Sequence, residues 1–130
     1  MRAVDTNVLV RLLFNDHPRQ SVAAEAFVAG GAWISLVVIV ETVWVLETSC
    51  GFEREQLAAA VELLLGHRSL SFQDEDVIAA ALQSFRTRGG VSFSDCLILE
   101  CARKAGHVPL GTFDRDLARL SDTELLRAAG

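Results

Sequence analysis

Apolar residues recur at helical spacing through most of this chain, and short apolar runs lie between the helical segments. Val8, Leu9, Leu12 and Leu13 share one face of a helix that directly follows the first such run. A proline at the start of one segment and glycines at the ends of others mark the limits of further helices. The helices predicted in this way span residues 8–13, 18–30, 36–48, 53–66, 74–88 and 92–104, with a last short helix after residue 114.

The short apolar runs between these helices predict strands. They span residues 2–5, 33–35, 70–72 and 108–111, while residues 125–126 fit either an edge strand or a frayed helix end. Strands that alternate with helices are typical of a mostly parallel sheet covered on both faces. We therefore predict an α/β fold, in which ligands bind beyond the carboxyl ends of the strands. The prolines are isolated and no segment is repeated, so a single domain over residues 1–130 is expected.

The composition excludes several classes of protein. The three cysteines have no C-x-x-C spacing, which argues against a zinc site or a disulfide framework. A membrane-spanning helix needs about 20 apolar residues, and the longest apolar run, residues 32–46, is shorter than this. No secretory signal is recognised, so we expect a cytoplasmic protein. The net charge of −5 argues against a protein that coats duplex nucleic acid, because such proteins are usually basic.

Acidic residues stand where two of the predicted strands end. Asp5 follows the first strand, and Asp114 follows the strand at residues 108–111, with Asp116 two residues further along. Strand ends of a parallel sheet open onto the ligand crevice, so these carboxylates are expected to face it. Taken alone, Asp5 fits equally well as the N-cap of the following helix.

A further acidic residue lies on a helix face that is otherwise apolar. Glu41 shares its face with Val37, Val38, Trp44 and Val45. We interpret Glu41 as pointing inward, where an ionised carboxylate is costly unless it is paired or binds a metal. A salt bridge to an arginine, or a side chain that reaches solvent at the edge of the face, would also explain it.

Asp95 repeats this situation near the start of the helix at residues 92–104, where Ile98, Leu99 and Ala102 lie on its face. The helix dipole alone would also favour an acid there. It is nevertheless improbable that four acidic residues should stand at strand ends or on apolar helix faces by chance.

These four residues account for −4 of the net charge of −5 and leave −1 for the rest of the chain, so the acidity is local. They are Asp5, Glu41, Asp95 and Asp114. Oxygen ligands without histidine or cysteine suit Mg²⁺ or Mn²⁺, which can activate water to attack a phosphodiester.

The order and spacing of these acidic residues resemble those of the PIN domain family, and within it the VapC-type toxins of toxin–antitoxin modules. The likeness extends over essentially the whole chain. The matching segments are Val4-Asp5-Thr6-Asn7, Val40-Glu41-Thr42, Phe93-Ser94-Asp95-Cys96-Leu97-Ile98 and Thr112-Phe113-Asp114-Arg115-Asp116-Leu117.

The resemblance implies a PIN-like α/β/α sandwich whose central, mostly parallel sheet has four or five short strands. It implies an endoribonuclease that depends on Mg²⁺ or Mn²⁺, cleaves single-stranded RNA and leaves 5′-phosphate and 3′-hydroxyl ends. It also implies a homodimer, and a VapB-like antitoxin that lays a helix and a basic segment into the acidic groove.

The resemblance assigns roles to individual residues as well. The catalytic and metal-binding acids would be Asp5, Glu41, Asp95 and Asp114, with Asp116 as an auxiliary ligand or as the fourth ligand in place of Asp114. Three residues would orient carboxylates or water by hydrogen bonds, namely Thr6, Asn7 and Thr112.

RNA must also be held by positive charge, although exposed basic residues are more often ordinary solvated side chains. The basic candidates are Arg11, Arg86, Arg88, Arg103, Lys104, Arg115 and Arg119. Trp33 and Trp44 lie in apolar runs and are expected in the core or in a dimer contact rather than under nucleobases. The three histidines receive no catalytic role.

Two alternatives belong to other classes of protein. A catalytically silent PIN-like scaffold would bind RNA or a partner without cleaving RNA. A receiver-like domain that accepts a phosphoryl group fits less well, because residues 70–72 are followed by Gln73 rather than Asp, and the single lysine, Lys104, lies on a helix.

Overall fold

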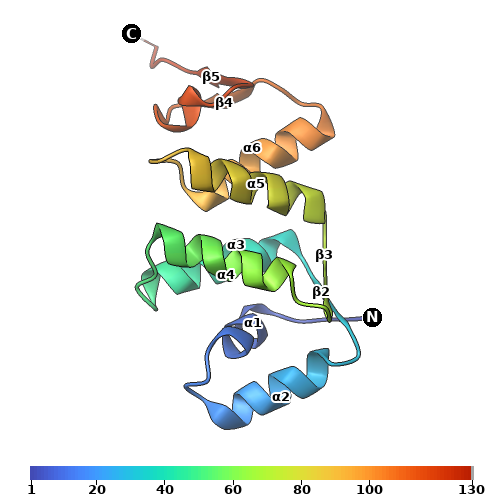
Figure 1. The fold of residues 1–130 in the computed structure, drawn as a ribbon. Coiled ribbons are helices and arrows are strands. Elements are labelled where there is room, and N and C mark those ends of the chain that lie inside the picture. The colour runs from blue at the N-terminus through green and yellow to red at the C-terminus, as the bar shows by residue number, and fades with distance from the viewer. Residues whose placement is uncertain (130) are drawn as a thin grey trace. The chain divides into compact units, whose positions relative to one another are not determined.

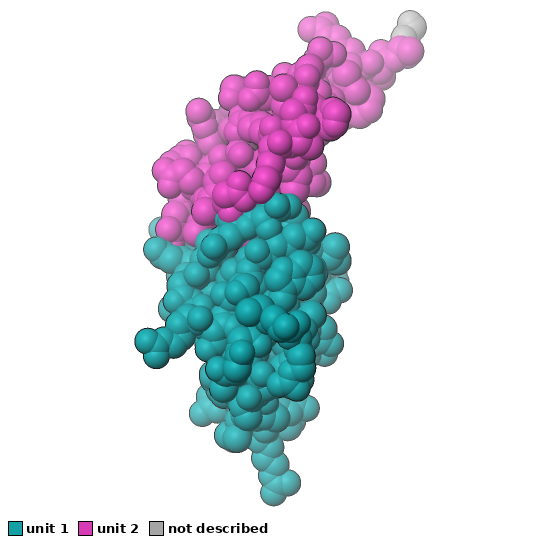
Figure 2. All heavy atoms as spheres, turned by 90° about the vertical axis from the view of Figure 1, so that its right-hand side faces the viewer, with its two compact units in different colours: residues 1–75 teal, residues 76–130 magenta. Residues whose placement is uncertain are grey.

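The computed structural model describes residues 1–129. The chain folds as two compact units, Met1–Glu75 and Asp76–Gly130 (Figure 2). The single domain expected over residues 1–130 stays a prediction.

The first unit contains a sheet of three short parallel strands. The strands are β1 (Arg2–Ala3), β2 (Ala32–Ile34) and β3 (Leu70–Phe72), in the order β1-β2-β3. In the register, Ala3 lies opposite Trp33, and Ile34 lies opposite Phe72. Because all three strands run the same way, their carboxyl ends lie at one edge of this sheet.

Four helices complete the first unit: α1 (Thr6–Leu13), α2 (Pro18–Val28), α3 (Leu36–Thr48) and α4 (Arg54–Leu65). Each begins at a local signal, because Asp5 and Ser35 cap α1 and α3, Pro18 opens α2, and Glu53 forms a capping box with Gln56 at α4. Helix α1 packs against α2 and α3, and α3 lies beside α4 (Figure 1). The largest fully buried side chains of this unit are Leu9, Val28, Ile34, Ile39, Thr42, Leu46 and Val61.

The second unit is built mainly from α5 (Glu75–Thr87) and α6 (Phe93–Ala105). Phe85 and Phe93 meet edge to face at 5.8 Å between ring centroids, and both are buried. Helix α6 ends at Gly106 in the left-handed conformation, with φ of +80°. Beyond it, β4 (Leu110–Thr112) pairs in parallel with β5 (Thr123–Leu125), and the 3₁₀ helix η1 (Leu117–Arg119) lies between them in the chain (Figure 1).

The structure confirms the α/β class, the parallel strands and the six helices before residue 106. The strands of residues 1–129 form one sheet of three strands and one of two, whereas one central sheet was expected. Strands of two or three residues carry too little pattern to reveal their partners. The last short helix is a 3₁₀ turn, and Thr123–Leu125 is a strand.

Further predictions about composition can be compared with the structure. All three cysteines are free thiols, and of these Cys96 is buried. None of the helices in residues 1–129 has the length and apolar character needed to cross a membrane. Trp44 was expected in the core or in a dimer contact, but it is 63% exposed on α3, and Val37 on the same helix is 76% exposed. Trp44 is therefore a surface residue of α3 and not a core residue, while the dimer contact expected as the alternative stays a prediction.

Candidate functional site

Asp5 stands between β1 and α1. Its backbone is extended, with φ of −99°, and its Oδ1 accepts the N–H of Val8 at 3.4 Å, so it is the N-cap of α1. The preceding Val4 is buried, which anchors the chain at this point. Asp5 therefore caps α1 through Oδ1, and its second carboxylate oxygen stays free of this hydrogen bond. Both expectations for Asp5, a helix cap and an exposed carboxylate at the strand end, hold at once.

Glu41 is connected to the start of α1 by a side-chain hydrogen bond. The hydroxyl of Thr6 donates to Glu41 Oε1 at 2.5 Å, across 35 positions of sequence. Thr6 is one of two buried polar residues in the described chain, whereas Asp5 beside it is exposed. Thr6 thus brings Asp5 and Glu41 into the same neighbourhood of the first unit. That this contact orients a metal ligand, as the resemblance implies for Thr6, stays a prediction.

The interpretation of Glu41 as an inward charge is wrong. Its side chain lies on the exposed side of α3, between Val37 and Trp44, which are themselves exposed. Helix α3 is apolar on almost every side, so its sequence does not distinguish the face that packs on α1 and α4 from the face that meets solvent. Glu41 is therefore partnered by Thr6 while it remains accessible to a ligand.

Asp95 lies in the first turn of α6 and is half-buried. Ser92 is the N-cap, and its Oγ accepts the backbone N–H of Asp95 at 3.1 Å. The second serine of this turn, Ser94, lies 3.2 Å from Ser92 through the two hydroxyl oxygens. The hydrogen bond uses the backbone of Asp95 and not its side chain. The Asp95 carboxylate therefore does not cap α6, although it lies at the helix N-terminus, where the helix dipole is positive.

Asp114 organises the turn that follows β4. Its Oδ1 accepts the backbone N–H groups of Asp116 at 2.8 Å and Leu117 at 3.1 Å, while its own N–H donates to Thr112 Oγ1 at 3.0 Å. Thr112 therefore fixes the backbone of Asp114 and does not orient its carboxylate. One oxygen of Asp114 is engaged in holding the start of η1, and the other makes no hydrogen bond to the residues described.

Asp116 has different neighbours. Its Oδ1 lies 3.3 Å from Arg119 Nη1 in an exposed ion pair. A Cβ atom added to Gly90 would lie 3.3 Å from both Cγ and Oδ1 of Asp116. The absence of a side chain at Gly90 therefore lets the Asp116 carboxylate approach the backbone closely. Because Gly90 lies two residues before the cap of α6, Asp116 sits near the loop that leads to Asp95. The second unit thus places Asp114 and Asp116 in one turn and brings Asp116 to the approach to α6.

The donor chemistry of these residues fits a hard divalent cation, since every acidic candidate offers carboxylate oxygen. The candidates fall into two groups, with Asp5 and Glu41 in the first unit and Asp95, Asp114 and Asp116 in the second. Within residues 1–129, no three acidic, histidine or cysteine side chains gather closely enough to enclose an ion. Asn7, expected to orient a ligand, is exposed, and its side chain makes no hydrogen bond to the described residues.

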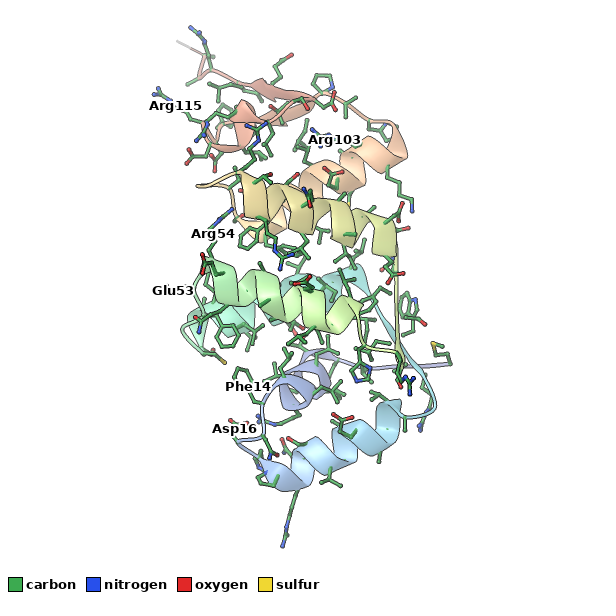
Figure 3. All side chains as sticks on the ribbon, viewed as in Figure 1. Phe14, Asp16, Glu53, Arg54, Arg103 and Arg115 are labelled. Carbon is green, nitrogen blue, oxygen red and sulfur yellow. The ribbon has the colours of Figure 1, made fainter. Side chains whose placement is uncertain are left out.

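Most of the basic candidates have local partners. Arg11 binds Asp16 at 3.3 Å and Gln20 at 2.6 Å, so it ties α1 to the segment that begins α2 and lines a cavity of about 380 Å³ between these helices. Lys104 pairs with Asp76 at 3.0 Å. Arg86 and Arg88 are exposed and also have partners within the chain. Arg115 projects outward from the loop between β4 and η1 and pairs with no described residue (Figure 3).

Arg103 is the basic residue whose role the sequence did not reveal. Its guanidinium points from α6 toward β4 and β5 (Figure 3) and donates to Glu100 Oε1 at 2.6 Å and to Asp122 Oδ2 at 3.0 Å. It also donates to the carbonyl and the hydroxyl of Ser121, both at 2.8 Å. Arg103 therefore ties the helix that carries Asp95 to the corner before β5. Glu100 lies three residues away on the same helix, but Ser121 and Asp122 lie 18 and 19 residues away, so sequence spacing gave no signal for these two partners.

Comparison with known proteins gives one result. A family model described as PIN domain matches residues 2–122. The match extends from the first unit into the second and includes every acidic candidate from Asp5 to Asp116. No curated protein matches the chain, and no solved structure matches it.

Proposed function

The chain belongs to the PIN domain family, and from this premise we propose that it is a metal-dependent endoribonuclease. PIN domains are generally metal-dependent nucleases. The observation that carries the proposal is the series Asp5, Glu41, Asp95 and Asp114, which lies in family order inside one continuous match over residues 2–122. Because that match crosses the boundary at residue 75, we propose that both units belong to a single catalytic domain.

The residues proposed to hold the cation are Asp5, Glu41, Asp95 and Asp114, with Asp116 as the alternative or additional ligand. When bound, Mg²⁺ or Mn²⁺ supplies an activated water and neutralises charge on the phosphodiester. The chain's own groups orient the ligands. Thr6 holds Oε1 of Glu41, and two backbone N–H groups hold Oδ1 of Asp114, so each carboxylate is fixed through one oxygen and presents the other.

The finer assignment is a cytoplasmic toxin of a type II toxin–antitoxin pair that forms a homodimer and is bound by a VapB-like antitoxin. Its substrate would be single-stranded RNA, cut to leave 5′-phosphate ends. The order and spacing of the acidic motifs support this assignment. Growth arrest on expression, relieved by the product of a neighbouring small gene, is the expected behaviour of such a toxin.

A matched pair of substitutions on α3 tests the proposal. Glu41→Gln removes a proposed ligand, whereas Glu47→Gln makes the same change at an exposed position on the same helix. We expect Glu41→Gln to lose cleavage of a labelled single-stranded RNA and to weaken Mn²⁺ binding measured by calorimetry, and Glu47→Gln to resemble the wild type. Equal losses in both variants, or in neither, would contradict the role of Glu41.

The alternative function is a PIN-like scaffold without catalysis. The finding that favours it is that no three potential ligands gather within residues 1–129. A scaffold would bind RNA without Mg²⁺-dependent stabilisation and without cleavage products. Thermal unfolding in rising Mg²⁺, followed by analysis of RNA incubated with the same samples, separates the two functions.

A further inference from the structure

Phe113 differs from the other six phenylalanines of the chain in its exposure. Its side chain is 70% exposed, whereas the remaining six are buried or half-buried. It stands directly between Thr112, the last residue of β4, and Asp114. An exposed phenylalanine ring does not gain the free energy that burial of an apolar side chain provides. The packing of the second unit therefore gives no reason for a phenylalanine beside Asp114.

The backbone on both sides of Phe113 is fixed by hydrogen bonds. The carbonyl of Thr112 accepts the N–H of Leu126 at 2.7 Å, and Thr112 Oγ1 accepts the N–H of Asp114 at 3.0 Å. Asp114 in turn holds the N–H groups of Asp116 and Leu117, and Leu117 is buried. The ring is therefore presented by a rigid loop. A preorganised aromatic side chain loses little entropy when a flat ligand stacks on it.

The charges around the ring indicate the kind of ligand. Asp114, Arg115 and Asp116 follow it, and Arg115 is exposed and forms no ion pair with the described residues. The centre of a protein–protein interface is usually depleted in charged residues, so this setting is unfavourable for a dry protein contact. A nucleotide offers both a flat base for the ring and a phosphate for the guanidinium.

We propose that Phe113 is a stacking platform for a base of single-stranded nucleic acid, with Arg115 contacting a phosphate of the same strand. This inference rests on the proposed ribonuclease function and assigns to the segment after β4 a contact that fixes the position of the strand. The platform has no means of reading a Watson–Crick edge. It therefore selects unpaired bases over paired ones and discriminates weakly among sequences.

Binding of a fluorescein-labelled single-stranded RNA of mixed sequence tests the platform, measured by anisotropy in an Asp95→Asn background that keeps the RNA intact. Phe113→Ala is expected to weaken binding about tenfold, the loss that one base–aromatic stack produces. Phe113→Trp is expected to bind within about twofold of the parent, because an indole also stacks. Phe113→Leu keeps an apolar side chain without a ring and is expected to bind as weakly as Phe113→Ala.

Val108→Ala is the matched control, since Val108 is 45% exposed before the opposite end of β4. It is expected to leave RNA binding unchanged. Phe113→Ala is also compared with the wild type by light scattering, which detects a role of the ring in contact between copies of the chain. An RNA affinity unaffected by Phe113→Ala overturns the proposal, whether or not the oligomeric state changes, and so does full binding by Phe113→Leu.

The outcome is distinguishable from failure of the proposed function. If the chain with Asp95 intact cleaves RNA while Phe113→Ala binds RNA normally, the platform is wrong and the nuclease assignment stands. If the chain neither binds nor cleaves single-stranded RNA, both are wrong. Circular dichroism of Phe113→Ala checks that the fold is intact, and Phe113→Leu keeps the test decisive if the alanine variant does not fold, because full binding by Phe113→Leu overturns the proposal.

Discussion

The hydroxyl of Thr6 holds Oε1 of Glu41 at 2.5 Å, and it joins the first turn of α1 to the middle of α3. Thr6 is 5% exposed, so its hydroxyl has little access to water as an alternative partner. The contact fixes one rotamer of a carboxylate that otherwise projects into solvent. If Glu41 is a metal ligand, its affinity for the ion depends on a residue that does not touch the ion.

Thr6→Val keeps the shape of the side chain and removes the donor. We expect Mn²⁺ affinity and RNA cleavage to fall by about 10- to 100-fold, the usual effect of losing a group that orients a metal ligand. Thr6→Ser restores a hydroxyl and is expected to recover most of both. Thr48→Val on α3 is the control, because the Thr48 hydroxyl bonds only to the backbone of Trp44. Metal titration calorimetry measures the difference, and wild-type affinity in Thr6→Val would refute the role.

Gly90 and Gly89 form a natural pair of test positions. Gly90 has φ of +87° and leaves room for the carboxylate of Asp116, whereas a Cβ at Gly89 meets nothing within 4 Å. We expect Gly90→Ala to cost about 1–2 kcal/mol of unfolding free energy from the left-handed backbone alone. It should also displace Asp116 and weaken Mn²⁺ binding. Gly89→Ala is expected to be neutral or slightly stabilising in the same urea denaturation experiment, and similar behaviour of the two variants would contradict this explanation.

Arg103 is expected to control the stability of the strand pair β4–β5. Its side chain is 27% exposed and that of Glu100 is 13% exposed, so the guanidinium bonds lie partly out of water. Arg103→Ala is expected to cost about 2 kcal/mol, because charge-assisted bonds are lost and Glu100 is left without its partner. Arg103→Lys should recover part of this, since it restores charge but not the planar fork.

Hydrogen exchange locates the effect of Arg103→Ala. Faster exchange is expected at the amides of Leu110, Leu126 and Asp116, and little change in the first unit. Lys104→Ala removes the neighbouring exposed pair with Asp76 and is expected to have a small effect. Uniform acceleration throughout the chain, or none, would exclude a local role for Arg103.

Asp76 gives a prediction for pH. The hydrogen bond and charge of Lys104 lower the pKa of the Asp76 carboxyl below 3.8. A folded-state pKa below the unfolded value means that this pair stabilises the fold above the unfolded pKa. That contribution is lost as pH falls through the folded pKa. NMR titration of Asp76 is expected to give a value below 3.8 that rises in Lys104→Met, and an unchanged value in that variant would show that Lys104 is not the cause.

Local signals made much of the fold predictable. The bounds Leu36–Thr48 and Leu70–Phe72 follow from hydrophobic runs between residues that end them. The start of α6 at Phe93 follows from the preceding Ser92, whose hydroxyl caps the helix by accepting the N–H of Asp95. Sequence spacing was sufficient to predict a helix bound wherever the interacting groups lie within one helical turn of each other.

Long-range relationships were not predictable in the same way. Periodicity shows that Glu41 and Trp44 share a face of α3, but it does not show that this face is exposed when the helix is apolar on nearly every side. The bond from Thr6 to Glu41 and the contact of Gly90 with Asp116 depend on packing between separate elements. The order of the acidic residues indicated metal-binding chemistry. The groups that contact each acidic residue could be identified only from the folded structure.

Metal-dependent RNA cleavage is the central claim, and an add-back assay tests it most directly. The purified chain is incubated with a 5′-labelled single-stranded RNA in excess EDTA, then with Mg²⁺ or Mn²⁺ restored, beside Asp95→Asn. We predict no cleavage in EDTA, recovery of cleavage with either ion, labelled products with 3′-hydroxyl ends, and no activity in Asp95→Asn. Equal cleavage in EDTA, or full activity of Asp95→Asn, would contradict the account.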